Sequence, residues 1–121
     1  MQILTNISYN HFKYNNKEIS IPCITEEPLD IETLEFLQEQ FYILGTQTLN
    51  TYHPISYQLM IDPEKATHII TFRRYPDIPP ISYDSLEYIK EDIQITFCDF
   101  DHQVNLVSDN LTIILVLTAP I

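Results

Sequence analysis

Asp99, Asp101 and His102 form a local cluster whose residue types could ligate a metal ion. Carboxylate oxygens and an imidazole nitrogen bind divalent cations, so an occupied site would support a small metal-dependent enzyme. The cluster lacks the further ligands that a full coordination shell needs, and an aspartate-rich hairpin turn has the same composition. We therefore expect no metal, and a metal-dependent enzyme is the most distant alternative.

Nucleophilic and phosphate-binding chemistry has still less support in the sequence. The other histidines, His11, His53 and His68, are dispersed, and none has a recognisable spacing to a nucleophilic Ser or Cys. The chain holds a single glycine, Gly45, so it cannot build a glycine-rich loop around a phosphate. The sequence predicts neither an enzyme nor a cofactor.

The charge of the chain points to a different kind of function. Seventeen Asp and Glu residues against six Lys and Arg residues give a net charge of −11. Direct nucleic-acid binding is disfavoured, because phosphate contacts need basic patches. An acidic surface instead attracts basic proteins, so the expected partner is a nuclease or a nucleic-acid-binding effector.

One helix is predicted with the clearest pattern, over residues 29–44. Leu34, Leu37, Phe41 and Leu44 recur at spacings of three and four residues, which places them on one stripe of an α-helix. Gly45 follows the last of them, where a glycine in the left-handed conformation commonly ends a helix. The stripe is expected to face a hydrophobic core.

The opposite side of this helix is the first predicted partner-binding surface. Helical geometry groups the side chains of Glu32, Glu35, Phe36, Glu39 and Ile43 away from the apolar stripe. An aromatic side chain within a rim of carboxylates is typical of a protein-binding hot spot. The alternative is that a sheet edge or loop covers Phe36, or that the helix buries a wider stripe.

A second predicted surface lies after the proline-rich segment 75–80. A short helix is expected over about 85–92, and its candidate contact residues are Tyr83, Asp84, Glu87 and Glu91. Tyrosine beside carboxylates suits recognition, since tyrosine offers contact area at little entropic cost. The alternative is that several of the eight tyrosines lie in the core of a chain that lacks tryptophan.

The rest of the chain predicts an α+β fold, in which an antiparallel sheet of about five to seven strands packs against the main helix. Turns are expected at Asn15-Asn16, at His53-Pro54 and from Asp62 to Lys65. The runs expected to supply these strands are 2–9, 12–21, 46–52, 55–61, 67–73, 93–100, 104–107 and 111–117, the last of them central. The whole chain, residues 1–121, is expected to form a single globular domain.

Neither a secretory signal nor a membrane-spanning stretch is apparent, so we expect a cytoplasmic protein, in a bacterium or, if phage-encoded, in its host. The leading functional hypothesis is an acidic inhibitor, either an immunity protein or antitoxin, or a nucleic-acid mimic acting against a defence system. The alternative is a small structural or assembly subunit of a phage or secretion system, whose strand edges would join identical copies into a homo-oligomer.

Overall fold

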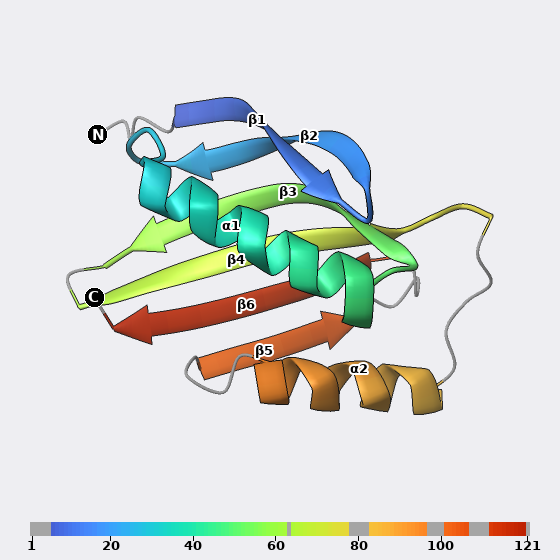
Figure 1. The fold of residues 1–121 in the computed structure, drawn as a ribbon. Coiled ribbons are helices and arrows are strands. Elements are labelled where there is room, and N and C mark those ends of the chain that lie inside the picture. Colours follow the sequence, from blue (N-terminus) through green and yellow to red (C-terminus); the bar gives the residue numbers. More distant parts are fainter. Residues whose placement is uncertain (1–5, 63, 78–82, 97–100, 107–111, 121) are drawn as a thin grey trace.

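The computed structural model describes residues 6–62, 64–77, 83–96, 101–106 and 112–120. These form six strands, two α-helices and one π-helical segment, η1 (Figure 1). In chain order they are β1 (Asn6–Tyr14), β2 (Lys17–Thr25), α1 (Ile31–Ile43), η1 (Leu44–Thr48), β3 (Tyr52–Ile61), β4 (Lys65–Arg74), α2 (Tyr83–Thr96), β5 (Asp101–Leu106) and β6 (Thr112–Pro120). The predicted α+β fold is confirmed.

The six strands form one sheet in the order β1-β2-β3-β4-β6-β5. Every neighbouring pair is antiparallel except β2 and β3, which pair in parallel because α1 connects them as a crossover. The sheet is therefore mixed rather than purely antiparallel. β6 lies between β4 and β5, as its continuously apolar sequence predicted.

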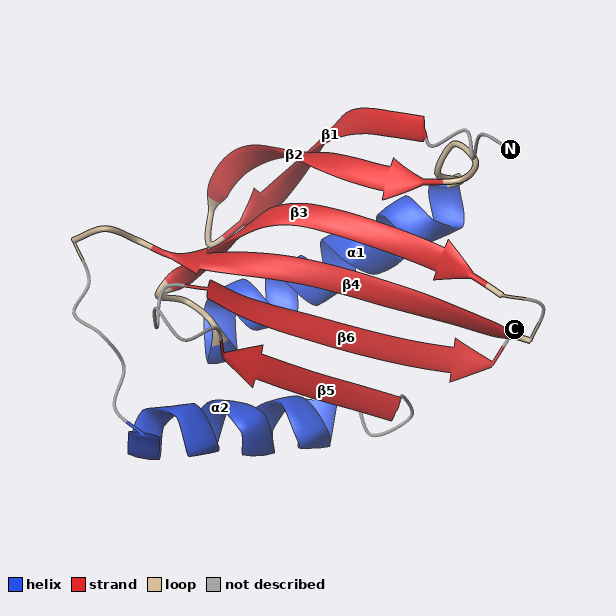
Figure 2. Cartoon of the chain, turned by 180° about the vertical axis from the view of Figure 1, so that it is seen from behind, coloured by secondary structure: helices blue, strands red, loops and turns tan. Residues whose placement is uncertain are grey.

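The molecule has two layers, with α1 lying across one face of the sheet (Figures 1 and 2). Cys23, Tyr57, Ile70 and Leu115 form a row of paired residues across four strands, and all are buried in the core with α1. The neighbouring row consists of Ile24, Gln58, Ile69 and Val116. Its side chains point to the other side of the sheet, where no described helix lies. In both views α2 runs alongside β5, and its Ile89 and Ile93 join the same core.

Asparagine sets the first hairpin. Asn15 and Asn16 have φ values of 51° and 63°, which a two-residue hairpin turn requires and which asparagine tolerates. The predicted turn is confirmed, but β1 runs unbroken from Asn6 to Tyr14 where the sequence suggested two separate strands.

Other boundaries differ from the prediction where tertiary pairing overrides local signals. His53-Pro54 is no turn but lies inside β3, which accommodates the proline at an irregularity in its register with β4. The turn after β3 is confirmed by reciprocal backbone hydrogen bonds between Asp62 and Lys65. The expected strand over 46–52 is instead the end of the π-helical segment, up to Thr48, followed by a turn before β3. The described part of the expected strand over 93–100 continues α2.

Both ends of α1 differ from the predicted range of 29–44, since the helix begins at Ile31 and ends at Ile43. Asp30 caps the helix, because its carboxylate accepts a hydrogen bond of 2.8 Å from the backbone N–H of Thr33. Gly45 was predicted to end the helix in the left-handed conformation. This prediction is wrong, since the φ of Gly45 is not positive. A Cβ at Gly45 would lie 3.0 Å from the backbone nitrogen of Asn15 and 3.2 Å from the Tyr14 ring. A glycine fits here because η1 and the first hairpin approach closely.

Tyrosines fill much of the core, as a chain without tryptophan requires. Tyr14, Tyr52 and Tyr57 are fully buried. The Tyr14 hydroxyl donates a hydrogen bond of 2.5 Å to the carbonyl oxygen of Leu49, and burial raises the pKa of Tyr14 far above its usual value. Leu37, Phe41 and Leu44 are buried as predicted.

Candidate partner-binding surface

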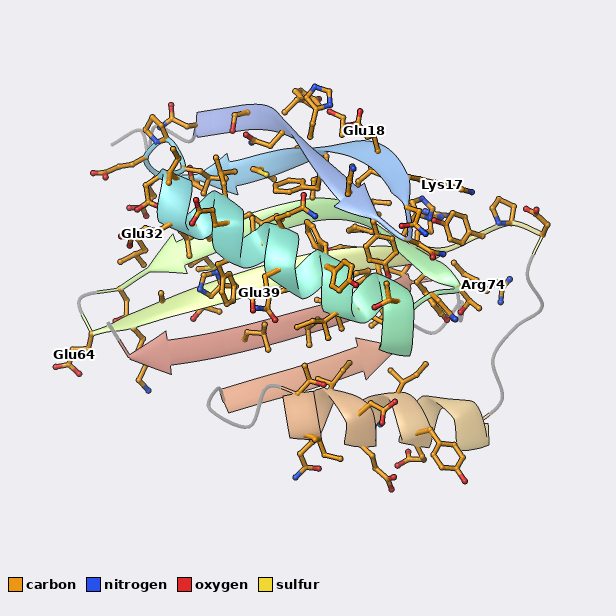
Figure 3. The ribbon with its side chains drawn as sticks, viewed as in Figure 1. Lys17, Glu18, Glu32, Glu39, Glu64 and Arg74 are labelled. Atoms are coloured by element: carbon orange, nitrogen blue, oxygen red, sulfur yellow. The ribbon has the colours of Figure 1, made fainter. Side chains whose placement is uncertain are left out.

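The exposed stripe of α1 is the first part of the candidate site. Glu32, Glu35 and Glu39 are all exposed, with Glu32 and Glu39 extending outward from α1 (Figure 3). Their spacings of three and four residues place them on one side of the helix. Tyr42 continues the same stripe, and 64% of its surface is exposed. The α1 stripe, defined as Glu32, Glu35, Glu39 and Tyr42, is therefore a row of carboxylates that ends in an aromatic side chain.

Phe36 does not belong to this stripe, so its predicted exposure is wrong. Its side chain is half-buried against the core, and its ring centroid lies 4.9 Å from that of His68 on β4. Ile43 is also half-buried. The helix buries a wider side than its four strongest apolar positions implied, including Gln40, which is 9% exposed. Tyr42 occupies the place in the carboxylate rim that the sequence assigned to Phe36.

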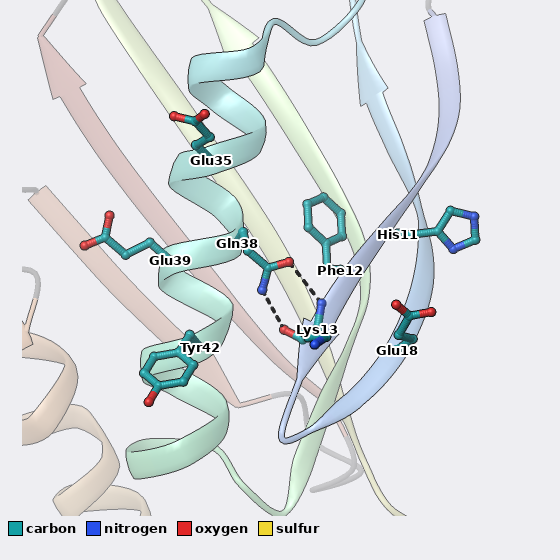
Figure 4. A pocket seen from close by; sticks show the side chains of 8 residues that line it. All are labelled: His11, Phe12, Lys13, Glu18, Glu35, Gln38, Glu39 and Tyr42. Atoms are coloured by element: carbon teal, nitrogen blue, oxygen red, sulfur yellow. Dashed lines mark hydrogen bonds between the residues drawn. The ribbon is translucent and has the colours of Figure 1, made fainter.

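A groove separates α1 from β1, next to the α1 stripe (Figure 4). Its volume is about 660 Å³. The residues that line it come from three elements and are His11, Phe12, Lys13, Glu18, Glu35, Gln38, Glu39 and Tyr42. Carboxylates therefore border this groove from α1 and from the first hairpin.

Gln38 bridges the groove at one point. Its side-chain oxygen accepts a hydrogen bond of 3.0 Å from the backbone N–H of Lys13. Its side-chain nitrogen donates one of 2.9 Å to the backbone carbonyl of the same residue. Figure 4 shows Gln38 pointing toward β1, whereas Glu35 and Glu39 point away from it. The carboxylates thus lie on the rim of the groove and not on its floor.

The second predicted surface is only partly described. Glu87 and Glu91 of α2 are exposed, and Tyr88 between them is 69% exposed. Glu87 lies 3.7 Å from the ammonium group of Lys90, the one ion pair among the described residues. The side chains of Tyr83 and Asp84 lie outside the described part of the structure.

His68 and Tyr57 form a polar pair under α1. The Tyr57 hydroxyl lies 2.7 Å from Nδ1 of His68. Burial lowers the pKa of His68 and raises that of Tyr57, so both groups are held neutral. Which of the two groups donates depends on which ring nitrogen of the neutral imidazole carries the proton, and in either case the hydrogen bond links β3 to β4 beneath α1.

The structure does not test the predicted metal-ligating cluster. Asp99 lies outside the described residues, as do the side chains of Asp101 and His102. Within the described ranges, no three His, Cys, Asp or Glu side chains come together as a possible metal site. No described helix is long and apolar enough to span a bilayer.

Comparison with known proteins gives no further assignment. No family model matches the chain, and no curated protein or solved structure is significantly similar to it.

Proposed function

We propose that this protein is an acidic inhibitor that binds a basic surface of a nuclease or another nucleic-acid-binding effector, as an immunity protein, an antitoxin or a nucleic-acid mimic. The observation that carries the proposal is the α1 stripe beside a groove. Glu32, Glu35 and Glu39 are exposed and form no ion pair within the described part of the chain. Their charge is therefore available to a partner.

Charge and contact area have separate roles in this proposal. A net charge of −11 attracts a basic partner over a distance, and it raises the association rate most at low salt. Affinity needs a desolvated anchor as well, and Tyr42 supplies an exposed aromatic side chain at the end of the carboxylate row. A tyrosine within a polar rim has the composition of a binding hot spot.

The uncovered face of the sheet favours a second candidate function, a subunit that assembles with copies of itself. Ile24, Ile69 and Val116 lie in register on this face and are half-buried, while Met60 is 51% exposed. This face also carries Gln58 and the hydrogen-bonded pair Thr67 and Thr118, and a mixed face of this kind suits an interface between subunits. Sedimentation velocity of the purified protein tests this candidate, and a concentration-dependent oligomer that Met60→Lys dissociates would favour it.

Co-purification tests the leading proposal. Tagged protein is recovered from its native host at low and at high salt, beside a variant carrying Glu35→Gln and Glu39→Gln. A matched control carries Glu87→Gln and Glu91→Gln on α2. We expect a basic nuclease or effector with the wild type and the control, lost at high salt and reduced in the α1 variant. Equal recovery with both variants would contradict the assignment of the site to α1.

A further inference from the structure

The outer edge of β1 has backbone groups that are available for pairing. β1 is the end strand of the sheet, with β2 as its one described strand neighbour. In an antiparallel pair, residues alternate between those that bond to the partner strand and those whose N–H and C=O point outward. The backbone N–H and C=O of Lys13 point outward, away from β2, because both bond to the side chain of Gln38. By alternation, His11, Tyr9 and Ile7 point outward as well.

Pro22 supports this assignment independently. It lies opposite Tyr9 in the β1–β2 pairing. Proline has no N–H to donate, so it fits a ladder only where no bond to the partner strand is required. Its position opposite Tyr9 is therefore the one expected if Tyr9 bonds outward and not to β2. No described backbone group pairs with the outward N–H or C=O of Ile7, Tyr9 or His11.

The groove opens onto this edge. His11, Phe12 and Lys13 are consecutive, and all three line the groove. Successive side chains of a strand point to opposite faces of the sheet, so a groove that contacts all three must lie along the edge of the strand. Gln38 shows what the edge accepts, since its amide presents one donor and one acceptor to Lys13 as a peptide group of a neighbouring strand would. Beyond Lys13, toward Tyr9, the described structure supplies no such group.

We propose that the edge of β1 from Ile7 to His11 binds an extended, basic segment of a protein partner, which adds to the sheet as a further strand. Main-chain hydrogen bonds to the outward groups provide affinity in this mode of recognition, and alternate side chains provide specificity. The groove is bordered by three carboxylates, those of Glu18, Glu35 and Glu39, and by one ammonium group, that of Lys13, so its charge favours Lys and Arg in that segment. This inference rests on the proposed function and defines how the partner binds.

A second copy of the chain fits this edge less well. Pairing β1 with β1 would bring two grooves together, each with three carboxylates (Glu18, Glu35 and Glu39) against one ammonium group (Lys13), in a molecule whose net charge is −11. Like charges placed together across an interface oppose association. A basic segment instead neutralises the rim.

Binding of a nine-residue peptide that alternates Lys with Val and Thr tests the proposal by NMR of the ¹⁵N-labelled full chain. We expect saturable shifts and at least tenfold slower hydrogen exchange at the amides of Ile7, Tyr9 and His11. The amides of Ser8 and Asn10 already face β2 and serve as internal controls, with little change expected. The same peptide with Glu in place of Lys is expected not to bind.

N-methylated peptides separate strand pairing from charge attraction. Two versions of the peptide carry N-methyl groups on alternate residues, in one register or in the other. In a strand added to β1, only alternate residues direct their N–H groups toward β1. Methylation of those N–H groups is expected to lower the affinity at least tenfold, and methylation of the other set is expected to lower it much less. Equal affinities of the two versions, or unchanged exchange at Tyr9 and His11, would overturn the inference. Salt-sensitive capture of a partner through Glu35 and Glu39 would then still support the proposed function.

Two protein variants complete the test. Tyr9→Pro removes one outward N–H without removing a β1–β2 bond, while Tyr9→Ala removes the side chain alone. Provided that both variants keep the wild-type NMR spectrum outside β1, we expect Tyr9→Pro to bind the Lys peptide at least tenfold more weakly than Tyr9→Ala. Equal binding would contradict the proposal, as would a free protein that is already a dimer and is dissociated by Tyr9→Pro.

Discussion

α1 and α2 expose similar chemistry in different surroundings. Each helix presents carboxylates around one exposed tyrosine, which is Tyr42 on α1 and Tyr88 on α2. The α1 stripe borders a groove and the outer edge of β1, whereas the described carboxylates of α2 lie beside Lys90, which pairs with Glu87. The sequence pattern of an acidic helix therefore does not define a site. The neighbouring elements decide whether its charge and its aromatic side chain can act together.

The largest effect concerns the side on which α1 docks. Leu37→Ala removes a fully buried side chain and leaves a cavity, so we expect it to lower the free energy of unfolding by about 2 to 5 kcal/mol. Glu39→Ala on the opposite side serves as the control, with a change of about 0.5 kcal/mol or less expected. Chemical denaturation measures both. Equal midpoints would mean that the exposed stripe has been assigned to the wrong side of the helix.

The two tyrosines provide the sharpest test of the difference between the helices. Once a partner is isolated, we expect Tyr42→Ala to weaken binding by roughly 2 kcal/mol, mainly through faster dissociation, because it removes the proposed anchor. Tyr88→Ala is expected to change the affinity little, since Tyr88 does not line the groove between α1 and β1. Surface plasmon resonance on folded variants resolves the two rates. A larger loss for Tyr88→Ala would move the site to α2.

Close packing between η1 and the first hairpin fixes α1 relative to β1, and so fixes the groove. Gly45→Ala would push a methyl group against the Asn15 backbone and the buried Tyr14 ring. We expect overpacking to cost roughly 1 to 3 kcal/mol, partly offset by about 1 kcal/mol of helix propensity. Thermal denaturation measures the net loss. A stabilised variant would show that the hairpin yields, in which case the width of the groove is not rigidly set.

The sequence predicted the parts of α1 that depend on periodicity, but not those that depend on neighbours. Leu37 and Phe41 were found because the strongest apolar positions recur at helical spacing. Phe36 was misplaced because its burial depends on His68, a residue of a distant strand. Tyr42 was missed for the same reason, since nothing local distinguishes a tyrosine in the core from one in solvent.

Strand order sets a second limit on prediction from the sequence. Hairpin signals located Asn15-Asn16 and the turn from Asp62 to Lys65. No local signal shows that β1 is an end strand or that β2 and β3 are parallel, because both follow from how α1 crosses the sheet. The free edge of β1 was therefore invisible in the sequence, although Pro22 opposite Tyr9 becomes informative once the pairing is known.

The pair of His68 and Tyr57 beneath α1 predicts that stability depends on pH. No described group on α2 predicts such a dependence. Burial lowers the pKa of His68 below its ordinary value of 6.5, so the unfolded chain takes up this proton more readily than the folded protein. Stability should fall as the pH drops from about 6.5 toward the pKa of the folded state. His68→Gln removes the titrating group, so denaturation midpoints between pH 7.5 and 5.5 should vary less in this variant. His53, whose pKa burial also lowers, is unchanged in both proteins. An equal pH dependence in the two proteins would assign the effect elsewhere.

The smallest effect is kinetic and depends on position rather than on total charge. Glu35→Gln with Glu39→Gln and Glu87→Gln with Glu91→Gln each remove two negative charges, so the net charge changes equally in the two variants. If the partner docks at α1, the first variant should lower the association rate several-fold and weaken its salt dependence, because the lost charges lie beside the contact and within about one Debye length of it. The second should change the rate less, since exposed charges farther away are screened. Association rates measured at two salt concentrations decide the matter, and equal rates for the two variants would mean that the whole molecule attracts the partner without a preferred helix.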